Sequence, residues 1–148
     1  MTSFSEIRKI KKPADYGIDF FIDDYKYECF WNNPERYLSK LRAFQVIIST
    51  DYSMLPEMLI GQRLWNCTRN RIMAYYLQER GFKVIPVASW CTEEDFQWCF
   101  DGLPIDSSIA ISSNGGLANP YGKRMLLRSI EELQLQKSPF KIIICGDE

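Results

Sequence analysis

The sequence QVIISTDYSMLPEMLIGQRLWNCTRNRIMAYYLQERG, residues 45–81, decides the fold prediction. It begins with the apolar run 46–49, which is typical of a buried strand, and passes through the polar turn 50–53 into a long helical pattern. That pattern ends at Gly81, a residue typical of helix C-caps, directly before a second strand-like run at residues 82–87. A strand, a helix and a strand in this order predict a βαβ unit with parallel strands.

The chain on either side of this unit repeats the same alternation of strands and helices. Strand-like runs lie at residues 17–22, 46–49, 82–87, 108–112 and 141–146, and each but the last precedes a helical pattern. We therefore predict one α/β domain of five βα-type units with a mainly parallel sheet, preceded by an N-terminal arm at residues 1–16. Two arrangements stay open: a partial (β/α) barrel with consecutive strands, or a doubly wound sheet whose order reverses.

The helical pattern at residues 55–80 contains two features that interrupt helices. Gly61 lies inside it, and a run of polar residues follows at 66–70. We predict that these features divide the pattern into two helices. In the polar run, Arg69 is a candidate for holding a phosphate or carboxylate with its guanidinium. The alternative is a solvated helix face on which Arg71 or Arg69 pairs with Glu79 or Glu57.

Composition and charge narrow the functional classes. The 148 residues carry a net charge of -1, which supplies no overall positive field and disfavours nucleic acid as a partner. No apolar run approaches the ~20 residues that a membrane span requires, so we expect a cytoplasmic protein without membrane contact. The chain has no histidine, and its five cysteines form no Cys-x-x-Cys pair. Histidine-dependent catalysis and structural zinc are thereby disfavoured. Any catalytic chemistry would have to use carboxylates, tyrosines, lysines, thiols or metal ions with oxygen ligands.

Polar residues follow the predicted strands at their carboxyl ends, where parallel sheets bind ligands. Asp23 and Asp51 are candidate catalytic residues and candidate ligands of Mg²⁺ or Mn²⁺. The other candidate ligand-binding residues, most of them at the same ends, are Asp24, Tyr52, Ser53, Arg69, Trp90, Asn114 and Gly115. A purely structural alternative is also open, because Asp after a strand often caps the next helix and Asn-Gly pairs are common in turns.

Several motifs together resemble a known family. They lie at residues 23–25, 31–35, 49–53, 66–71, 81–86 and 99–104. They are similar to those of a bacterial and phage family, domain of unknown function four-four-one-seven, over roughly residues 18–146. The resemblance implies a phage, prophage or plasmid setting and supplies no activity or catalytic residues. Because family members often continue past the fifth strand, it also implies a half-barrel whose edge a homodimer or another protein would cover.

Three hypotheses for the function follow. The first is binding or processing of a phosphorylated or nucleotide-like small ligand at the strand ends, which we favour. The second is a non-enzymatic phage accessory protein, for example an inhibitor of a host defence factor, that acts through a protein–protein surface. The third is a nucleic-acid-processing protein in which Asp23 and Asp51 hold a metal ion, and the net charge weighs against it.

Overall fold

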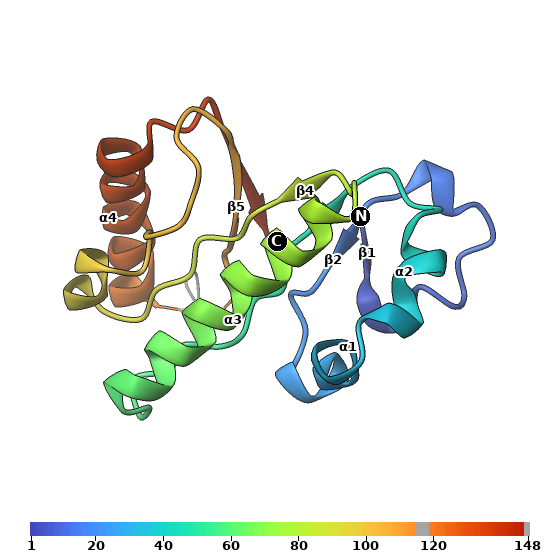
Figure 1. The fold of residues 1–148 in the computed structure, drawn as a ribbon. Coiled ribbons are helices and arrows are strands. Elements are labelled where there is room, and N and C mark those ends of the chain that lie inside the picture. The colour runs from blue at the N-terminus through green and yellow to red at the C-terminus, as the bar shows by residue number, and fades with distance from the viewer. Residues whose placement is uncertain (115–118, 147–148) are drawn as a thin grey trace.

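The strands lie side by side in the order in which they occur in the chain. The computed structural model describes residues 1–114 and 119–146. It contains a four-stranded sheet, ordered β1-β2-β3-β4, and a two-stranded sheet of β5 and β6, all with parallel neighbours (Figure 1). The strands are β1 (Thr2–Ser3), β2 (Ile18–Asp19), β3 (Ile47–Ile48), β4 (Val84–Ile85), β5 (Ser108–Ser112) and β6 (Lys141–Cys145).

A single parallel bridge between Val87 and Ala110 joins the two sheets. Two backbone hydrogen bonds flank it, from the Ala110 amide to the Pro86 carbonyl and from the Ala88 amide to the Ala110 carbonyl, both 2.9 Å. The α/β class with a mainly parallel sheet is therefore confirmed. Among the described strands the order never reverses and the sheet does not close, so the strands follow the consecutive order of the first alternative and not the reversed order of a doubly wound sheet.

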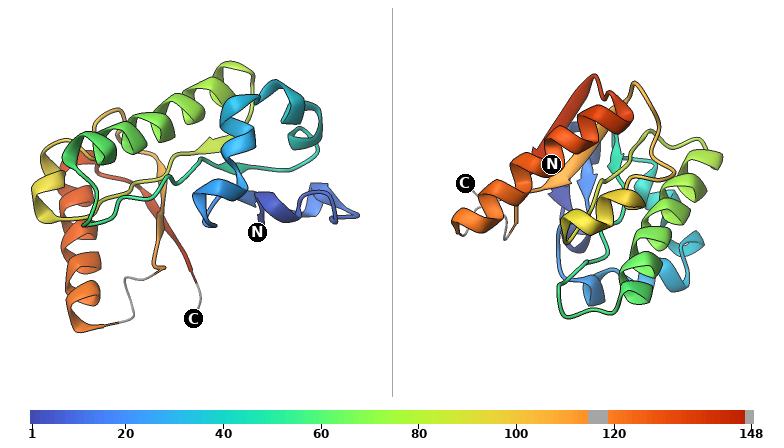
Figure 2. Two further views of the ribbon diagram at one scale, coloured as in Figure 1. Left: turned by 90° about the horizontal axis from the view of Figure 1, so that it is seen from below. Right: turned by 90° about the vertical axis from the view of Figure 1, so that its left-hand side faces the viewer.

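Helices fill the connections between the strands. The α-helices are α1 (Glu28–Asn32), α2 (Glu35–Leu41), α3 (Ile60–Glu79) and α4 (Pro120–Lys137). Short 3₁₀ helices are η1 (Phe4–Glu6), η2 (Pro13–Asp15), η3 (Asp24–Lys26) and η4 (Glu93–Gln97). α4 lies along β5 and β6, α1 and α2 lie at the opposite end beside β1 and β2, and α3 runs between them (Figures 1 and 2). Within the described part of the chain, none of the helices is long and apolar enough to cross a membrane.

α3 is one continuous helix of 20 residues, so the predicted division into two helices was wrong. Gly61 lies in its first turn, where the Gln62 side chain accepts a hydrogen bond from the Leu59 amide at 2.8 Å. The helix ends as predicted at Gly81, whose φ of +79° is favourable only for glycine. The amides of Gly81 and Phe82 donate to the carbonyls of Gln78 and Leu77, which is the Schellman pattern.

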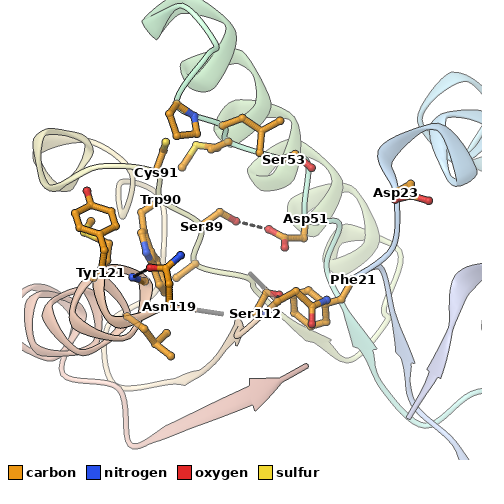
Figure 3. A pocket seen from close by; sticks show the side chains of 18 of the residues that line it. Phe21, Asp23, Asp51, Ser53, Ser89, Trp90, Cys91, Ser112, Asn119 and Tyr121 are labelled. Atoms are coloured by element: carbon orange, nitrogen blue, oxygen red, sulfur yellow. Dashed lines mark hydrogen bonds between the residues drawn. The ribbon is translucent and has the colours of Figure 1, made fainter. Parts of the chain in front are cut away.

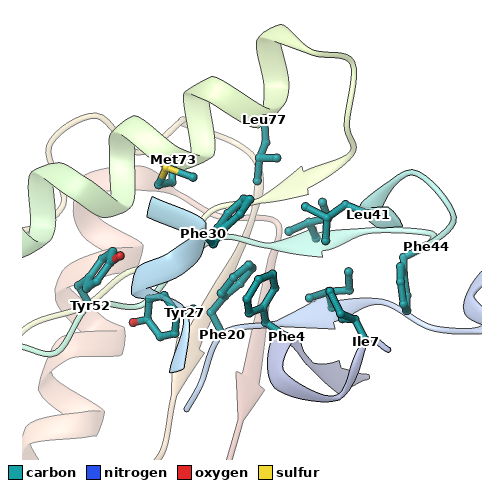
Figure 4. Packing of buried hydrophobic residues seen from close by; sticks show 12 residues of the cluster. Phe4, Ile7, Phe20, Tyr27, Phe30, Leu41, Phe44, Tyr52, Met73 and Leu77 are labelled. Atoms are coloured by element: carbon teal, nitrogen blue, oxygen red, sulfur yellow. The ribbon is translucent and has the colours of Figure 1, made fainter. Parts of the chain in front are cut away.

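The first core packs α1, α2 and α3 against β2 and β3 (Figure 4). Phe4, Phe20 and Phe30 form its centre, with ring centroids 4.9 to 5.4 Å apart. Phe4 and Ile7 come from the segment predicted to be an arm, and both are buried. Since β1 also pairs with β2, the first residues are part of the sheet and of its core.

A second core lies between α4 and the two-stranded sheet. Ile109 and Ile111 of β5 pack there with Leu126 and Leu133 of α4. The side chain between them in β5, Ala110, turns to the opposite face of the sheet and contacts a small cluster of Ile48 and Val87. The two faces alternate as expected for strands, and the helices cover the face with the large side chains.

Candidate functional site

A pocket of about 550 Å³ opens at the carboxyl ends of the strands, where the two sheets meet. Figure 3 shows Asp51 and Ser89 in its middle, Trp90, Asn119 and Tyr121 on one side, and Asp23 at the opposite margin. The sequence-predicted site residues that line it are Asp23, Asp51, Ser53, Trp90 and Asn114. This is the position at which parallel α/β sheets bind ligands.

Asp51 is the group with the most unusual environment in the pocket. It follows β3 after Ser49 and Thr50, which are both fully buried. Its Oδ1 accepts a hydrogen bond from the Ser89 hydroxyl, which lies beyond β4. Burial, with a smaller contribution from the nearby Asp24 charge, raises the pKa of the Asp51 carboxyl to about 6, although the Ser89 hydrogen bond and Arg71 oppose the rise. A carboxyl group with such a pKa can accept or give up a proton near neutral pH.

Side chains of α3 and η3 hold the loop that carries Asp51. The Asn70 Oδ1 accepts from the Tyr52 amide at 2.8 Å, and the Asn66 Nδ2 donates to the Ser53 carbonyl at 2.6 Å. From the other side, the Asp24 carboxylate accepts from the amide and hydroxyl of Ser53, at 3.2 and 3.0 Å. Asp24 and Tyr52 therefore act behind the pocket wall, and Ser53 lines it.

Arg71 does not lie on a solvated face with a glutamate partner, so that alternative was wrong. Its guanidinium donates to three backbone carbonyls: Nη1 to Val87 at 2.7 Å, Nη2 to Cys99 at 2.8 Å and Nε to Asp101 at 3.0 Å. The group thus joins α3 to the segment after β4, which carries Ser89. Burial lowers the pKa of the Arg71 guanidinium.

Arg69 lies away from the pocket, inside the aromatic core beside α1. Its guanidinium stacks 3.5 Å from the centroid of the Tyr52 ring and forms an ion pair with Glu28, with 3.2 Å between Nη1 and Oε2. Its Nη2 also donates to the Asn66 Oδ1 at 2.7 Å. These contacts account for the guanidinium within the fold, whereas the predicted role was to hold an anion.

Asp23 differs from Asp51 although both line the pocket. Its side chain is 62% exposed and forms an ion pair with Lys26 at 2.8 Å. Gly115 lies outside the described residues. Among the described residues, no group of three or more cysteines, aspartates and glutamates could hold a metal ion together. A Mg²⁺ or Mn²⁺ site at Asp23 and Asp51 therefore stays a prediction.

The pocket also contains residues that the sequence prediction did not select. Ser89 hydrogen-bonds to Asp51, and Asn119 and Tyr121 come from the start of α4. Asn119 is the N-cap of α4: its Oδ1 accepts from the Gly122 amide at 2.9 Å. The pair Asn119-Pro120 is a typical helix start, and placing that start at the carboxyl end of β5 would have indicated these residues.

Comparison with known proteins gives the family. A family model described as "Domain of unknown function (DUF4417)" matches residues 1–148, so the chain belongs to this family and the predicted resemblance is confirmed. The "Gene 1 protein" of Mycobacterium phage L5 is 34% identical over 130 residues, 88% of this chain and 57% of that protein. The "Gene 1 protein" of Mycobacterium phage D29 is 33% identical over 130 residues, 88% of this chain and 48% of that protein.

These relatives support the phage association of the family. The chain spans about half the length of the two phage proteins, at 48% and 57%. No solved structure gave a significant match.

Proposed function

We propose that this protein binds, and through Asp51 can process, a nucleotide-like small ligand in the pocket at the strand ends. One observation carries the proposal: a pocket of about 550 Å³ unites the half-buried Asp51 carboxyl, its partner Ser89 and the aromatic side chain of Trp90. Small-molecule sites typically combine an aromatic wall with few convergent polar groups, one of them with a shifted pKa.

The charges of the pocket favour contact with the uncharged base of a nucleotide-like ligand over contact with a phosphate group. Among the described residues that line it, two are aspartates and none is a lysine or an arginine. The start of α4 supplies the positive end of a helix dipole. However, Pro120 has no N–H, and Asn119 already accepts from the Gly122 amide, so few donors remain there for phosphate.

A thermal-shift scan tests this function. The purified protein is melted with nucleosides, nucleotides and sugar phosphates, each with and without Mg²⁺ or Mn²⁺, and the scan is repeated on Asp51→Asn. We expect stabilisation of the wild type by a nucleotide-like ligand and a smaller ligand-induced shift in the variant. Because Asp51→Asn changes the melting temperature by itself, only the shift between free and liganded protein is compared. Equal ligand shifts in both proteins would contradict a role for Asp51.

A second candidate function is supported by the outer face of α3, and it is action through a protein–protein surface. Apolar side chains on this face are exposed: Ile60 by 57%, Leu64 by 40%, Trp65 by 51%, Ile72 by 44% and Tyr75 by 63%. In a typical surface helix, polar and charged residues occupy the solvent side.

Two charged residues of α3 are turned inward, whereas Glu79 at the end of the helix is exposed. The side chains of Arg63 and Arg69 are only 11% and 13% exposed, and both form ion pairs within the fold. Exposed apolar patches of this kind mark contact sites for other molecules. The surface fits a partner that is itself apolar and uncharged, such as the outer face of another helix.

Substitution on the outer face of α3 tests the second function. Leu64→Glu places a charge in the middle of the apolar stripe, and Gln78→Glu places the same charge at its exposed end as a control. The molar mass in solution is measured by light scattering across a range of concentrations. Self-association that Leu64→Glu abolishes and Gln78→Glu preserves would identify a second copy as the partner. A monomer at every concentration would exclude a homodimer through this face.

A further inference from the structure

We propose that the pocket recognises an uncharged nitrogen heterocycle that stacks on Trp90 and donates a ring N–H to Asp51. Guanine, hypoxanthine and uracil are bases of this lactam type, in which an N–H lies beside a carbonyl group. The inference rests on the proposed function and specifies the base as the part of the ligand that the pocket recognises.

Trp90 supplies the flat wall that such a ring needs. It lines the pocket and is half-buried, so part of the indole is covered by the protein and part faces the cavity. The ring is supported from behind by Phe100, in an edge-on arrangement with centroids 6.3 Å apart and planes at 70°. A base on an aromatic side chain gains about tenfold or more in affinity.

Asp51 supplies the acceptor, and the chain sets its position relative to Trp90. Ser89, which donates to the Asp51 Oδ1, is the residue directly before Trp90. The carboxyl and the indole therefore belong to one connected unit of the pocket, with both facing the same cavity (Figure 3). Among the described residues, Ser89 is the only hydrogen-bond donor to this carboxyl, so Oδ2 remains for a ligand.

The charge balance determines which ligands suit this acceptor. Since none of the described lining residues is basic, an ionised Asp51 repels phosphate and carboxylate groups and is satisfied by a neutral N–H donor. The pKa of about 6 leaves the carboxyl mainly ionised at pH 7.5 and increasingly protonated at acid pH. A protonated carboxyl still accepts through its carbonyl oxygen but binds a ring N–H more weakly than a carboxylate does, so binding of a lactam base weakens as the pH falls through about 6.

The experiment uses matched ligands that differ by one hydrogen-bond donor. Inosine and uridine are titrated calorimetrically into the protein at pH 7.5, beside 1-methylinosine and 3-methyluridine, in which a methyl group replaces the ring N–H. We expect each methylated nucleoside to bind about tenfold to a hundredfold more weakly, the range for a hydrogen bond to a charged group. We also expect the unmethylated ligands to bind more weakly at pH 5.5 than at pH 7.5.

Variants test the two contacts separately. Trp90→Ala should weaken binding at least tenfold, and Trp90→Phe, which keeps an aromatic ring, should restore most of it. Asp51→Asn should abolish the pH dependence, and Asp15→Asn, an exposed carboxylate outside the pocket, is the matched control. Circular dichroism of each variant shows that it is folded.

The outcomes separate this inference from the proposed function. Equal affinity for methylated and unmethylated nucleosides, or tighter binding at pH 5.5, would overturn the N–H donor and leave a nucleotide-like ligand in place. Binding of ribose or sugar phosphates alone would overturn the base as the recognised part. If none of the nucleosides, nucleotides or sugars binds, both the inference and the proposed function are refuted.

Discussion

The substitution Asp51→Asn should stabilise the protein at neutral pH, because it removes a carboxylate that the fold holds in an unfavourable environment. Burial raises the pKa of the Asp51 carboxyl from 3.8 to about 6. At about 1.4 kcal/mol per pKa unit, the ionised carboxyl costs at most about 3 kcal/mol of the free energy of unfolding. Asparagine keeps an oxygen that can accept from Ser89, so the main change is the loss of the charge.

The sign of the pH dependence follows from the direction of the shift. The folded state binds this proton more tightly than the unfolded state, so the stabilisation by protonation is complete below pH 3.8. It is lost as the pH rises through about 6. The difference in unfolding free energy between Asp51→Asn and the wild type should therefore be small near pH 4 and grow to at most about 3 kcal/mol at pH 7.5.

Urea denaturation at several pH values between 4 and 7.5 measures this difference. Other carboxyl groups titrate over the same range, but they are common to both proteins and cancel in the comparison. Asp15→Asn, an exposed carboxylate in η2, reports the effect of one lost charge alone. At a midpoint shift of about 2–4 °C per kcal/mol, melting temperatures would show the same trend. A difference that is independent of pH, or a variant less stable at pH 7.5, would refute the buried-carboxylate argument.

Three further substitutions test how the fold positions the pocket. Arg71→Met leaves three backbone carbonyls without their donor and should lower the unfolding free energy in urea denaturation by about 3 kcal/mol or more; a loss below ~1 kcal/mol would contradict a role of Arg71 in holding the segment after β4. Gly81→Val forces a branched residue to φ +79° and should lower the melting temperature by the equivalent of at least ~1–2 kcal/mol, and an unchanged melting temperature would disprove the C-cap. Asn70→Ala leaves the buried Tyr52 amide unpaired and should cost about 1–3 kcal/mol, with faster hydrogen exchange at that amide; unchanged exchange would show that Asn70 does not hold the loop.

The sequence predicted the elements that have strong local patterns. Residues 108–112 alternate apolar and small side chains, and they form β5 with the same bounds. The C-cap at Gly81 was readable because only glycine is favourable at a positive φ. The rule for parallel strands pointed to their carboxyl ends, and Asp51 and Trp90 line a pocket there.

The parts that the sequence did not reveal depend on contacts between distant segments. Arg69 has donors suited to an anion, but its partner Glu28 lies 41 residues away and no local pattern pairs them. The N-terminal segment was predicted to be an arm because it is mostly polar and has no apolar run. Its apolar residues Phe4 and Ile7 are nevertheless buried in the core. The hydrogen bond from Ser89 to Asp51 forms because β3 and β4 lie side by side, which no local sequence pattern shows.

The polar face of α3 explains why a pattern-based division of that helix failed. Periodicity assigns polar helix positions to solvent, whereas here Asn66 and Asn70 are buried. The reason lies in the sheet: β1 to β4 are only two residues long, so the backbone beyond them has few ladder partners. Side chains replace those partners.

Side chains take the place of missing backbone hydrogen-bond partners on both sides of the pocket. The Ser49 hydroxyl accepts from the Val87 amide at 3.0 Å, where a longer β3 would have offered a carbonyl. Asn70 and Arg71, neighbours on α3, bind the backbone after β3 and after β4 respectively. One helix thus fixes both segments that meet at the Asp51–Ser89 hydrogen bond. Because β3 and β4 are only two residues long, the loops after them are not paired with each other along their length and a pocket lies between them. The hydrogen bonds from α3 fix the position of both loops and thereby of the pocket wall.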